Sequence, residues 1–299
     1  MPELLETYVI HVTKLCNLDC VYCYEPDKTS TYTVDEIYNH IDDIFMEIKK
    51  NSTQVSVEFL GGEPLLELGL IKLAYERIEQ KCGKNIRKYI ISSNGTIMND
   101  DILKFLLDTK DRLKLAISLD GKKFSNQLRY FKSSYENSYD TVVKNIKKLQ
   151  ANNYNPGVHM VTHPYNVSFL AENVMHIHED LCIDEIGVGI VESTIHIDKA
   201  FCDEFKRQME KLADYIVSEN IPVHVDMFNI LKPYSDNRTY VMEKGTTKVV
   251  FESYGRINNP IFNDTTKYDI VSDVNKSDTY NMIYDLRKHS YDYYNSLLK

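Results

Sequence analysis

The sequence has no apolar run near the length of a membrane-spanning helix, so no membrane partner is expected. The segment before the first predicted strand, residues 1–6, is short and acidic, so we expect no secretory signal peptide there. Only six of the 299 residues are cysteine, and three of these lie within residues 16–23. This usage favours a reducing compartment over a disulfide scaffold, and we expect the protein in the cytoplasm.

Clustered basic charge is also lacking. The 35 Lys and Arg residues are outnumbered by 44 Asp and Glu, which gives a formal net charge of −9. Binding to a phosphate backbone needs a clustered basic surface, so no nucleic-acid partner is expected. The chain shows no internal repeat or low-complexity segment. With 43% hydrophobic residues, it is predicted to fold as one large domain, or as one domain with a small appendage.

Three cysteines are gathered near the N-terminus, at Cys16, Cys20 and Cys23. They follow an apolar stretch, 8–12, that predicts a strand. A structural zinc site usually takes four ligands in two separated pairs, and no second Cys or Cys/His pair follows. Three thiolates suit a cubane iron–sulfur cluster that leaves one iron without a protein ligand. A zinc loop or three unrelated thiols is the alternative.

Apolar periodicity predicts six strand–helix units in succession. The predicted strands are 8–12, 55–60, 86–91, 113–119, 158–162 and 183–191, and the helices that follow them are 33–50, 67–81, 100–108, 141–150, 167–179 and 199–219. Such alternation predicts a parallel sheet with right-handed crossovers. Six units are too few for a closed eight-unit barrel. In parallel α/β folds the site lies at the carboxyl ends of the strands.

Four of these strand ends carry short motifs of small and polar residues. They are Gly61-Gly62-Glu63-Pro64, Ser92-Ser93-Asn94-Gly95, Ser118-Leu119-Asp120-Gly121 and the run 187–192. Glycine allows the backbone to pass close to a ligand, and the polar side chains offer hydrogen bonds to it. Ordinary turns are the alternative for the glycine and Asn-Gly motifs. Core packing is the alternative for the apolar residues of 187–192.

The C-x3-C-x2-C spacing, with Tyr22 before the last cysteine, resembles the cluster motif of the radical S-adenosylmethionine (SAM) enzymes. The strand-end motifs resemble those of the same superfamily, so the resemblance covers most of the chain. It implies an open, partial (β/α)6 barrel and one 4Fe–4S cluster on Cys16, Cys20 and Cys23. In that family the open iron chelates SAM, and an electron from the cluster cleaves SAM to a 5′-deoxyadenosyl radical that abstracts hydrogen from substrate.

The resemblance also implies a set of SAM-binding residues. The glycine-rich motif binds the SAM amino group, and the Ser-Asn-Gly and Ser-Leu-Asp-Gly segments reach other parts of SAM. Arg129 is a candidate for holding the SAM carboxylate, a bidentate task that suits a guanidinium, with a surface arginine as the alternative. The adenine is expected near the Tyr22 backbone and the end of the sixth strand. The set is Tyr22, Gly61, Gly62, Glu63, Pro64, Ser93, Asn94, Ser118, Arg129 and Ile190.

Several other residues are expected to be structural or to shape the turns. Asp120 shapes its turn or meets substrate, by the same resemblance. Cys82, Cys182 and Cys202 fit no cluster motif, and free cysteine packs as a small hydrophobe. The scattered histidines show no convincing metal spacing, so we expect them to be structural. They include His11, His159, His163, His176, His178 and His196.

The pattern changes from about Pro222, which predicts a barrel over 1–221 and a small α+β lobe over 222–299. In the lobe, 247–252 and 253–257 predict a hairpin, 268–271 a strand and 281–298 a helix. This layout resembles the SPASM or twitch domain of radical SAM peptide maturases, whose cysteines bind auxiliary clusters. No cysteine follows Cys202, and 258–260 stands where one would be expected. The sequence therefore predicts a SPASM-like scaffold without auxiliary clusters.

These features predict a radical SAM oxidoreductase that modifies a peptide or protein side chain, for example by cross-linking or epimerisation. The expected cofactors are one 4Fe–4S cluster and SAM, with an electron donor such as flavodoxin or ferredoxin. Few residues precede the first strand, so we expect a peptide to bind the barrel or the lobe directly, or to arrive with a separate recognition partner. The alternatives are a small metabolite or nucleoside substrate, or a non-catalytic zinc- or cluster-binding protein.

Overall fold

A computed structural model describes residues 5–23, 25, 28–51, 54–191, 195, 197–229, 242–243, 246–251 and 278–298. These residues form one curved sheet in the order β7-β6-β5-β4-β3-β2-β1-β9-β8. The strands are β1 Leu5–Thr13, β2 Val55–Gly61, β3 Ile86–Ser93, β4 Leu113–Ser118, β5 Gly157–Thr162, β6 Glu185–Ile190, β7 His224–Val225, β8 Met242–Glu243 and β9 Thr246–Phe251. Neighbours from β1 to β7 pair in parallel, as expected when a helical crossover joins each strand to the next.

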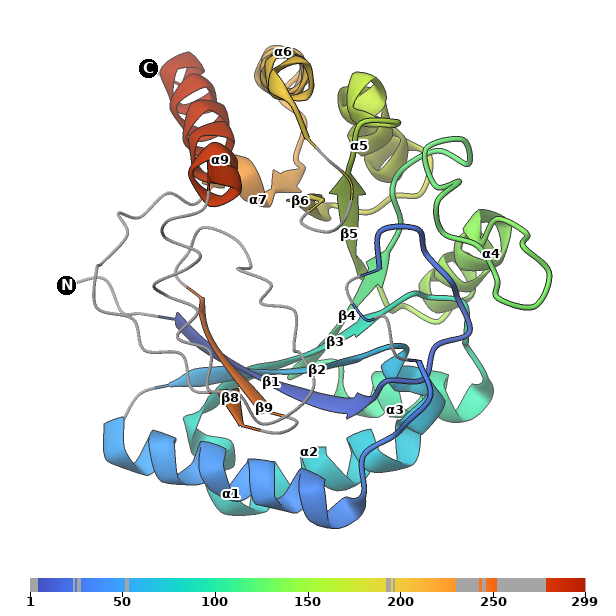
Figure 1. The fold of residues 1–299 in the computed structure, drawn as a ribbon, viewed down its shortest axis with the longest axis vertical. Helices are drawn as coiled ribbons and strands as arrows, with labels where there is room; N and C mark the ends of the chain where they lie inside the picture. Colours follow the sequence, from blue (N-terminus) through green and yellow to red (C-terminus); the bar gives the residue numbers. More distant parts are fainter. Residues whose placement is uncertain are drawn as a thin grey trace.

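Helices line the outer side of this curved sheet (Figure 1). They are α1 Val34–Asn51, α2 Leu68–Cys82, α3 Asp100–Thr109, α4 Tyr139–Gln150, α5 Leu170–Glu179, α6 Lys199–Ser218, the short α7 Asp226–Asn229 and α9 Asp278–Leu297. Short 3-10 helices occupy Pro64–Glu67, Gly83–Asn85 and Val167–Phe169. All six predicted strand–helix units are present, and the predicted partial α/β barrel is confirmed. No helix among the described residues is long and apolar enough to cross a membrane.

Alternation along the strands gives the sheet an apolar outer face and a more polar inner face. In β4, Leu113, Leu115 and Ile117 are fully buried in the same core as the surrounding helices. The residues that alternate with them, Lys114, Ala116 and Ser118, point to the opposite face and are less buried. Ser118 is paired in register with His159 of β5 on that inner face. The carboxyl ends of the strands therefore place half-buried polar side chains next to each other inside the barrel.

The sheet continues beyond the six predicted strands at both edges. The two-residue β7 pairs with β6, and it is too short for apolar periodicity to predict it. At the other edge β9 pairs antiparallel with β1, which confirms a strand at 247–251. Its hairpin partner is the preceding β8. The predicted partner 253–257, the strand 268–271 and the segment 258–260 lie outside the described residues.

The predicted C-terminal helix is confirmed as α9, which packs beside α6. A His289 ring nitrogen lies 2.7 Å from a Glu210 carboxylate oxygen, and the Tyr293 hydroxyl donates to Asp214 over 3.0 Å. Leu286 of α9 is 1% exposed and belongs to the main core. The boundary at 221/222 stays a prediction, since β7, β9 and α9 all contact elements of the barrel.

Candidate functional site

The three cysteines lie in the loop that follows β1, which we call the Cys loop (residues 14–23). Cys16, Cys20 and Cys23 are free thiols and each is half-buried. Cys20 interacts electrostatically with both of the others. Burial raises the pKa of Cys16, and it raises the pKa of Cys20 to about 12. Thiolates at these positions therefore need a compensating positive charge, which a bound metal supplies as it displaces the protons.

The three thiols of the Cys loop are a donor set that an iron–sulfur cluster can use. Among the described residues, no three His, Cys, Asp or Glu side chains are grouped closely enough to hold one ion. A zinc site needs its ligands to converge on one centre. Thiolates that bind different irons of a cubane need not converge in this way. The three half-buried free thiols of the Cys loop suit such a cubane, in which each thiolate binds a different iron.

A buried lysine lies beside the Cys loop. The Lys28 side chain is 7% exposed, and its ammonium group is 2.9 Å from Asp19 and 3.1 Å from the Leu18 carbonyl oxygen. Burial alone would lower the pKa of Lys28, but the hydrogen bond to Asp19 and the nearby Cys23 and Cys16 raise it overall. Lys28 therefore stays charged close to two of the thiols. No motif in the sequence marks it, because it stands alone in a polar segment.

The two glycines at the end of β2 allow a close approach of the Cys loop. A Cβ on Gly62 would lie 2.3 Å from the Leu15 carbonyl oxygen, and one on Gly61 would lie 2.1 Å from that of Thr13. Two backbone hydrogen bonds hold the segments together here. The Gly62 amide donates to the Thr13 carbonyl oxygen over 2.8 Å, and the Glu63 amide donates to the Leu15 carbonyl oxygen over 2.7 Å. The backbone that approaches Gly61 is therefore the last residue of β1, and the backbone that approaches Gly62 is the start of the Cys loop. Their contact with SAM stays a prediction.

Glu63 joins the motif after β2 to the motif after β3. Its carboxylate is fully buried and accepts hydrogen bonds from the Leu65 amide (3.0 Å), the Ser93 hydroxyl (2.8 Å) and the Asn94 amide (2.6 Å). Burial raises the pKa of Glu63 to about 7, although these hydrogen bonds lower it in part. Pro64 is buried and begins the 3-10 helix that follows Glu63.

Asn94 carries the link onward to the Cys loop. Its side-chain amide donates to the Asn17 oxygen over 2.8 Å and approaches the Cys16 sulfur at 3.7 Å. Asn17 in turn donates to the Thr96 hydroxyl over 2.8 Å. The second and third strand ends are therefore connected to the cluster loop by side chains. Sequence reasoning missed Asn17, because a single asparagine between two cysteines carries no signal of its own.

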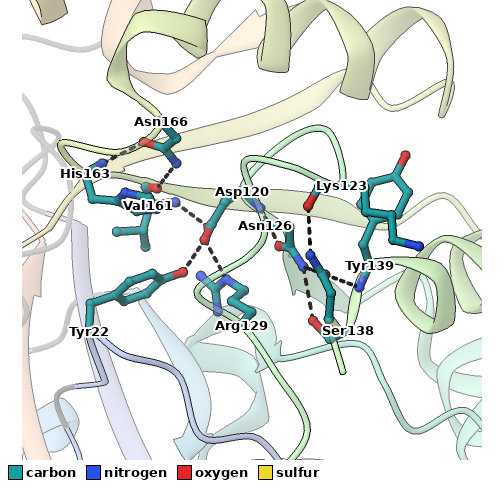
Figure 2. A network of polar contacts seen from close by, with 11 residues as sticks. Tyr22, Asp120, Lys123, Asn126, Arg129, Ser138, Tyr139, Val161, His163 and Asn166 are labelled. Atoms are coloured by element: carbon teal, nitrogen blue, oxygen red, sulfur yellow. Dashed lines mark hydrogen bonds and ion pairs between the residues drawn. The ribbon is translucent and has the colours of Figure 1, made fainter. Parts of the chain in front are cut away.

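Asp120, after β4, makes a third connection, shown in Figure 2. The side chain is fully buried. One carboxylate oxygen accepts from the Tyr22 hydroxyl and from Arg129 Nε at 3.0 Å, and the other accepts from the Val161 amide at 2.9 Å. The Asp120 amide donates to Asn126 over 3.1 Å. Asp120 therefore joins the Cys loop, the segment that carries Arg129, and β5.

Arg129 is buried, so it is not a surface arginine. It is 7% exposed, and its guanidinium lies 5.1 Å from the centroid of the Tyr22 ring. Burial alone would lower the pKa of Arg129, but the adjacent Asp120 carboxylate raises it overall. The ion pair commits Nε to Asp120. A contact between Arg129 and the SAM carboxylate stays a prediction.

The remaining predicted SAM residues lie on two different faces of the sheet. Ser118 is on the inner face, whereas the Ile190 side chain is 5% exposed and packs in the core. Core packing therefore accounts for the Ile190 side chain. Next to Ser118, His159 lies across β6, where a Cβ on Gly187 or Gly189 would come within 2.9 Å of its ring. Both glycines thus make room for an imidazole whose position sequence reasoning did not predict.

A second histidine, His163, lies against the Cys loop. It is fully buried, and its ring centroid is 5.5 Å from that of Tyr22. Burial lowers the pKa of His163 to about 4, so the ring is neutral at pH 7. Its Nε2 has no hydrogen-bond partner among the described residues. The sequence predicted a structural histidine, and its neighbour could not be predicted because the two rings come from distant segments.

Two curated proteins with a stated activity are similar to this chain. The radical SAM cyclopropyl synthase TigE of Paramaledivibacter caminithermalis is 22% identical over 257 residues, which cover 80% of this chain and 53% of TigE. The GTP 3′,8-cyclase of Clostridium botulinum is 34% identical over 117 residues, 38% of this chain and 34% of the cyclase. The chain thus spans about half of one relative and about a third of the other.

Among solved structures, anSMEcpe with bound AdoMet and Kp18Cys peptide has a TM-score of 0.64 and 17% identity, over 76% of this chain and 65% of that one. At this identity the likeness shows the fold alone. The family profile of the radical SAM superfamily matches residues 10–168, more than half of the chain. This match begins in β1, contains all three cysteines of the Cys loop and ends after β5. The protein therefore belongs to the radical SAM superfamily.

Proposed function

We propose that this protein is a radical SAM enzyme that binds one 4Fe–4S cluster through Cys16, Cys20 and Cys23 and cleaves SAM reductively. One observation carries the proposal: three free thiols share a loop that is hydrogen-bonded to the strand-end motifs beside it. When bound, the cluster supplies the electron that breaks a carbon–sulfur bond of SAM, and the resulting 5′-deoxyadenosyl radical abstracts hydrogen from substrate. Flavodoxin or ferredoxin is the proposed source of the electron.

The chain's own residues would bind and orient SAM. We assign the amino group to the backbone of 61–64 and to Glu63, whose carboxylate has one acceptor site left beside its three hydrogen bonds. Ser93, Asn94 and Ser118 would meet the ribose and methionyl parts. Arg129 would hold the carboxylate, since its ion pair with Asp120 uses only Nε. The backbone of Tyr22 and of Ile190 would border the adenine.

The test compares Cys20→Ala with Cys182→Ala. Cys20 is in the Cys loop, whereas Cys182 is an exposed cysteine that follows α5. After anaerobic reconstitution, wild type and Cys182→Ala should hold about four iron and four sulfide per chain. Both should form 5′-deoxyadenosine from SAM with dithionite, and Cys20→Ala should form none. Cleavage by Cys20→Ala, or bound zinc without iron in the wild type, would contradict the proposal.

For the substrate we propose a peptide or protein side chain. The support is that a protein of the same fold, anSMEcpe, was solved with both AdoMet and a peptide bound. A small metabolite or nucleoside is the second candidate, favoured by the 34% identity to a GTP 3′,8-cyclase. Peptides encoded beside the gene and GTP would each be incubated with the reconstituted enzyme and SAM. A mass change in a peptide supports the first candidate, and conversion of GTP supports the second.

We further propose that residues 222–299 contribute to substrate binding, as the resemblance to a SPASM-like lobe implies. The described parts of this region lie at both edges of the barrel sheet, as β7 next to β6 and β9 next to β1. A segment that covers both edges can border a substrate on the inner face. Turnover lost without loss of cluster or of SAM cleavage, after changes in this region, would support that role.

A further inference from the structure

The Cys loop has a side-chain anchor in addition to its cysteines. Tyr22 stands between Cys20 and Cys23, and it is 8% exposed while the adjacent Val21 is 50% exposed. Its ring lies against the Arg129 guanidinium, and its hydroxyl donates to Asp120 (Figure 2). Of the two residues between these cysteines, only Tyr22 therefore reaches into the body of the barrel.

Asp120 is fixed by the fold on the other side of this contact. Its second carboxylate oxygen accepts from the Val161 amide in β5, and its own amide donates to Asn126. The next residue, Gly121, has φ of +110°, and a Cβ there would lie 2.2 Å from the Asn173 side chain. The turn cannot shift towards α5, because Asn173 already fills that space. The Tyr22 hydroxyl is therefore held at a set position relative to β4 and β5.

The short chain around Tyr22 passes this restraint on to the thiols. The Cys23 amide donates to the Cys20 carbonyl over 3.1 Å, which closes a turn around Tyr22. The Val21 amide donates to Leu128, just before Arg129, over 3.1 Å. With the turn closed and its central ring fixed, the positions of Cys20 and Cys23 relative to each other are determined to a large extent by Tyr22.

The charge of Asp120 is balanced where it lies. A buried carboxylate without a partner is costly, and it would also repel thiolates in the nearby Cys loop. Arg129 is buried as well and its Nε lies 3.0 Å from the Asp120 carboxylate, so the pair is neutral as a whole. Asp120 can therefore accept the Tyr22 hydrogen bond without adding net charge beside the cysteines.

We propose that Asp120 is a positioning residue for the Cys loop, acting through the Tyr22 hydroxyl to fix the separation and orientation of Cys20 and Cys23. The inference rests on the proposed function in one respect, namely that the Cys loop binds an iron–sulfur cluster. The anchor itself belongs to the chain with or without a cluster. Asp120 touches neither the thiols nor, in this proposal, the reacting atoms.

The test uses Tyr22→Phe, with Tyr154→Phe as the matched control. Tyr154 is 5% exposed, and its hydroxyl accepts from the Leu115 amide over 2.8 Å. Each variant loses one buried hydroxyl that makes hydrogen bonds, so both should be less stable than wild type. Only Tyr22→Phe should release the Cys loop. A change confined to that variant cannot then be explained by general destabilisation.

The first measurement is hydrogen–deuterium exchange of the full-length apoprotein, followed in the peptide that covers the Cys loop. The Asp19 and Val21 amides donate to Tyr130 and Leu128 and should be protected in the wild type. In Tyr22→Phe their exchange should be about tenfold faster, or about 1.4 kcal/mol of lost protection. Tyr154→Phe should leave them unchanged. Wild-type exchange in the Cys loop of Tyr22→Phe would overturn the proposal.

The second measurement is the rate at which reconstituted protein loses iron to a chelator. Tyr22→Phe and Asp120→Asn should lose iron about tenfold faster than wild type, whereas Tyr154→Phe should match it. Equal rates in Tyr22→Phe and Tyr154→Phe would overturn the proposal, even where Asp120→Asn fails to fold. A wild type that takes up no iron would refute the proposed function instead, and the exchange experiment would still decide whether the anchor exists.

Discussion

Replacing Gly62 by alanine tests how closely the Cys loop must approach the end of β2. The added Cβ would lie 2.3 Å from the carbonyl oxygen of Leu15 and 2.4 Å from that of Lys14. Atoms at such a separation overlap, and both neighbours are backbone rather than movable side chains. The amide hydrogen bonds on either side, from Gly62 to Thr13 and from Glu63 to Leu15, prevent the strand end and the loop from separating freely.

The cost follows from this geometry. Overpacking in a tight interior costs about 1–3 kcal/mol, and more where the backbone has to move. Because Gly62→Ala forces a backbone shift, we expect the free energy of unfolding to fall by about 3 kcal/mol or more. The shift would fall on Leu15, the residue before Cys16. Iron uptake on reconstitution should therefore fall as well.

Gly69 provides the matched control. It is exposed in the first turn of α2, and a Cβ added there would have no neighbour within 4 Å beyond the adjoining residues and the backbone of its own helix. Alanine is a better helix former than glycine, so Gly69→Ala should stabilise the apoprotein by about 0.5–1 kcal/mol and leave iron uptake unchanged. Urea denaturation of both variants measures the difference. The reasoning is refuted by a Gly62→Ala protein within about 0.5 kcal/mol of wild type that takes up iron fully.

Two further changes test the buried carboxylate and the C-terminal helix. The pKa of Glu63 is raised by burial to about 7, so its stabilising contribution is present below the unfolded pKa of about 4.5 and is lost as pH rises through 7. Between pH 4 and pH 8 the free energy of unfolding of wild type should fall by about 3 kcal/mol relative to that of Glu63→Gln. The same pH dependence of unfolding in both proteins would argue against this. Leu286→Ala removes a core side chain of α9, so the free energy of unfolding measured by urea denaturation should fall by about 2–5 kcal/mol. The iron content should stay that of wild type. A loss of iron would instead link α9 to the Cys loop.

The strands and helices could be predicted because each has one face against the core. In β4, apolar Leu113, Leu115 and Ile117 alternate with less buried residues, and this signal is local. The two-residue β7 carries no such signal, although it extends the sheet. Local pattern therefore predicts the barrel and misses a strand that depends only on its neighbour.

The site could be predicted by position but not by contact. Parallel strands bring their carboxyl ends to one edge, so the motifs after β2, β3 and β4 were expected to meet. Which side chains pair there depends on long-range packing. Tyr22 and Asp120 are 98 residues apart in the sequence, and neither residue suggests the other. The same holds for Asn94 and Asn17, whose amide groups meet across 77 residues.

The hydrogen bonds already made decide which strand-end residues remain available to a ligand. Glu63 has used three of about four acceptor sites, and both Asp120 oxygens are occupied by protein donors. Asp120 is therefore better suited to holding the Cys loop than to binding substrate, and Glu63 has a single acceptor site left, the one assigned above to SAM. Ser118 and His159 instead lie half-buried, side by side on the inner face of β4 and β5. Substrate contacts should therefore be sought first on that inner face, because the two turn carboxylates have almost all their acceptor sites occupied by protein donors.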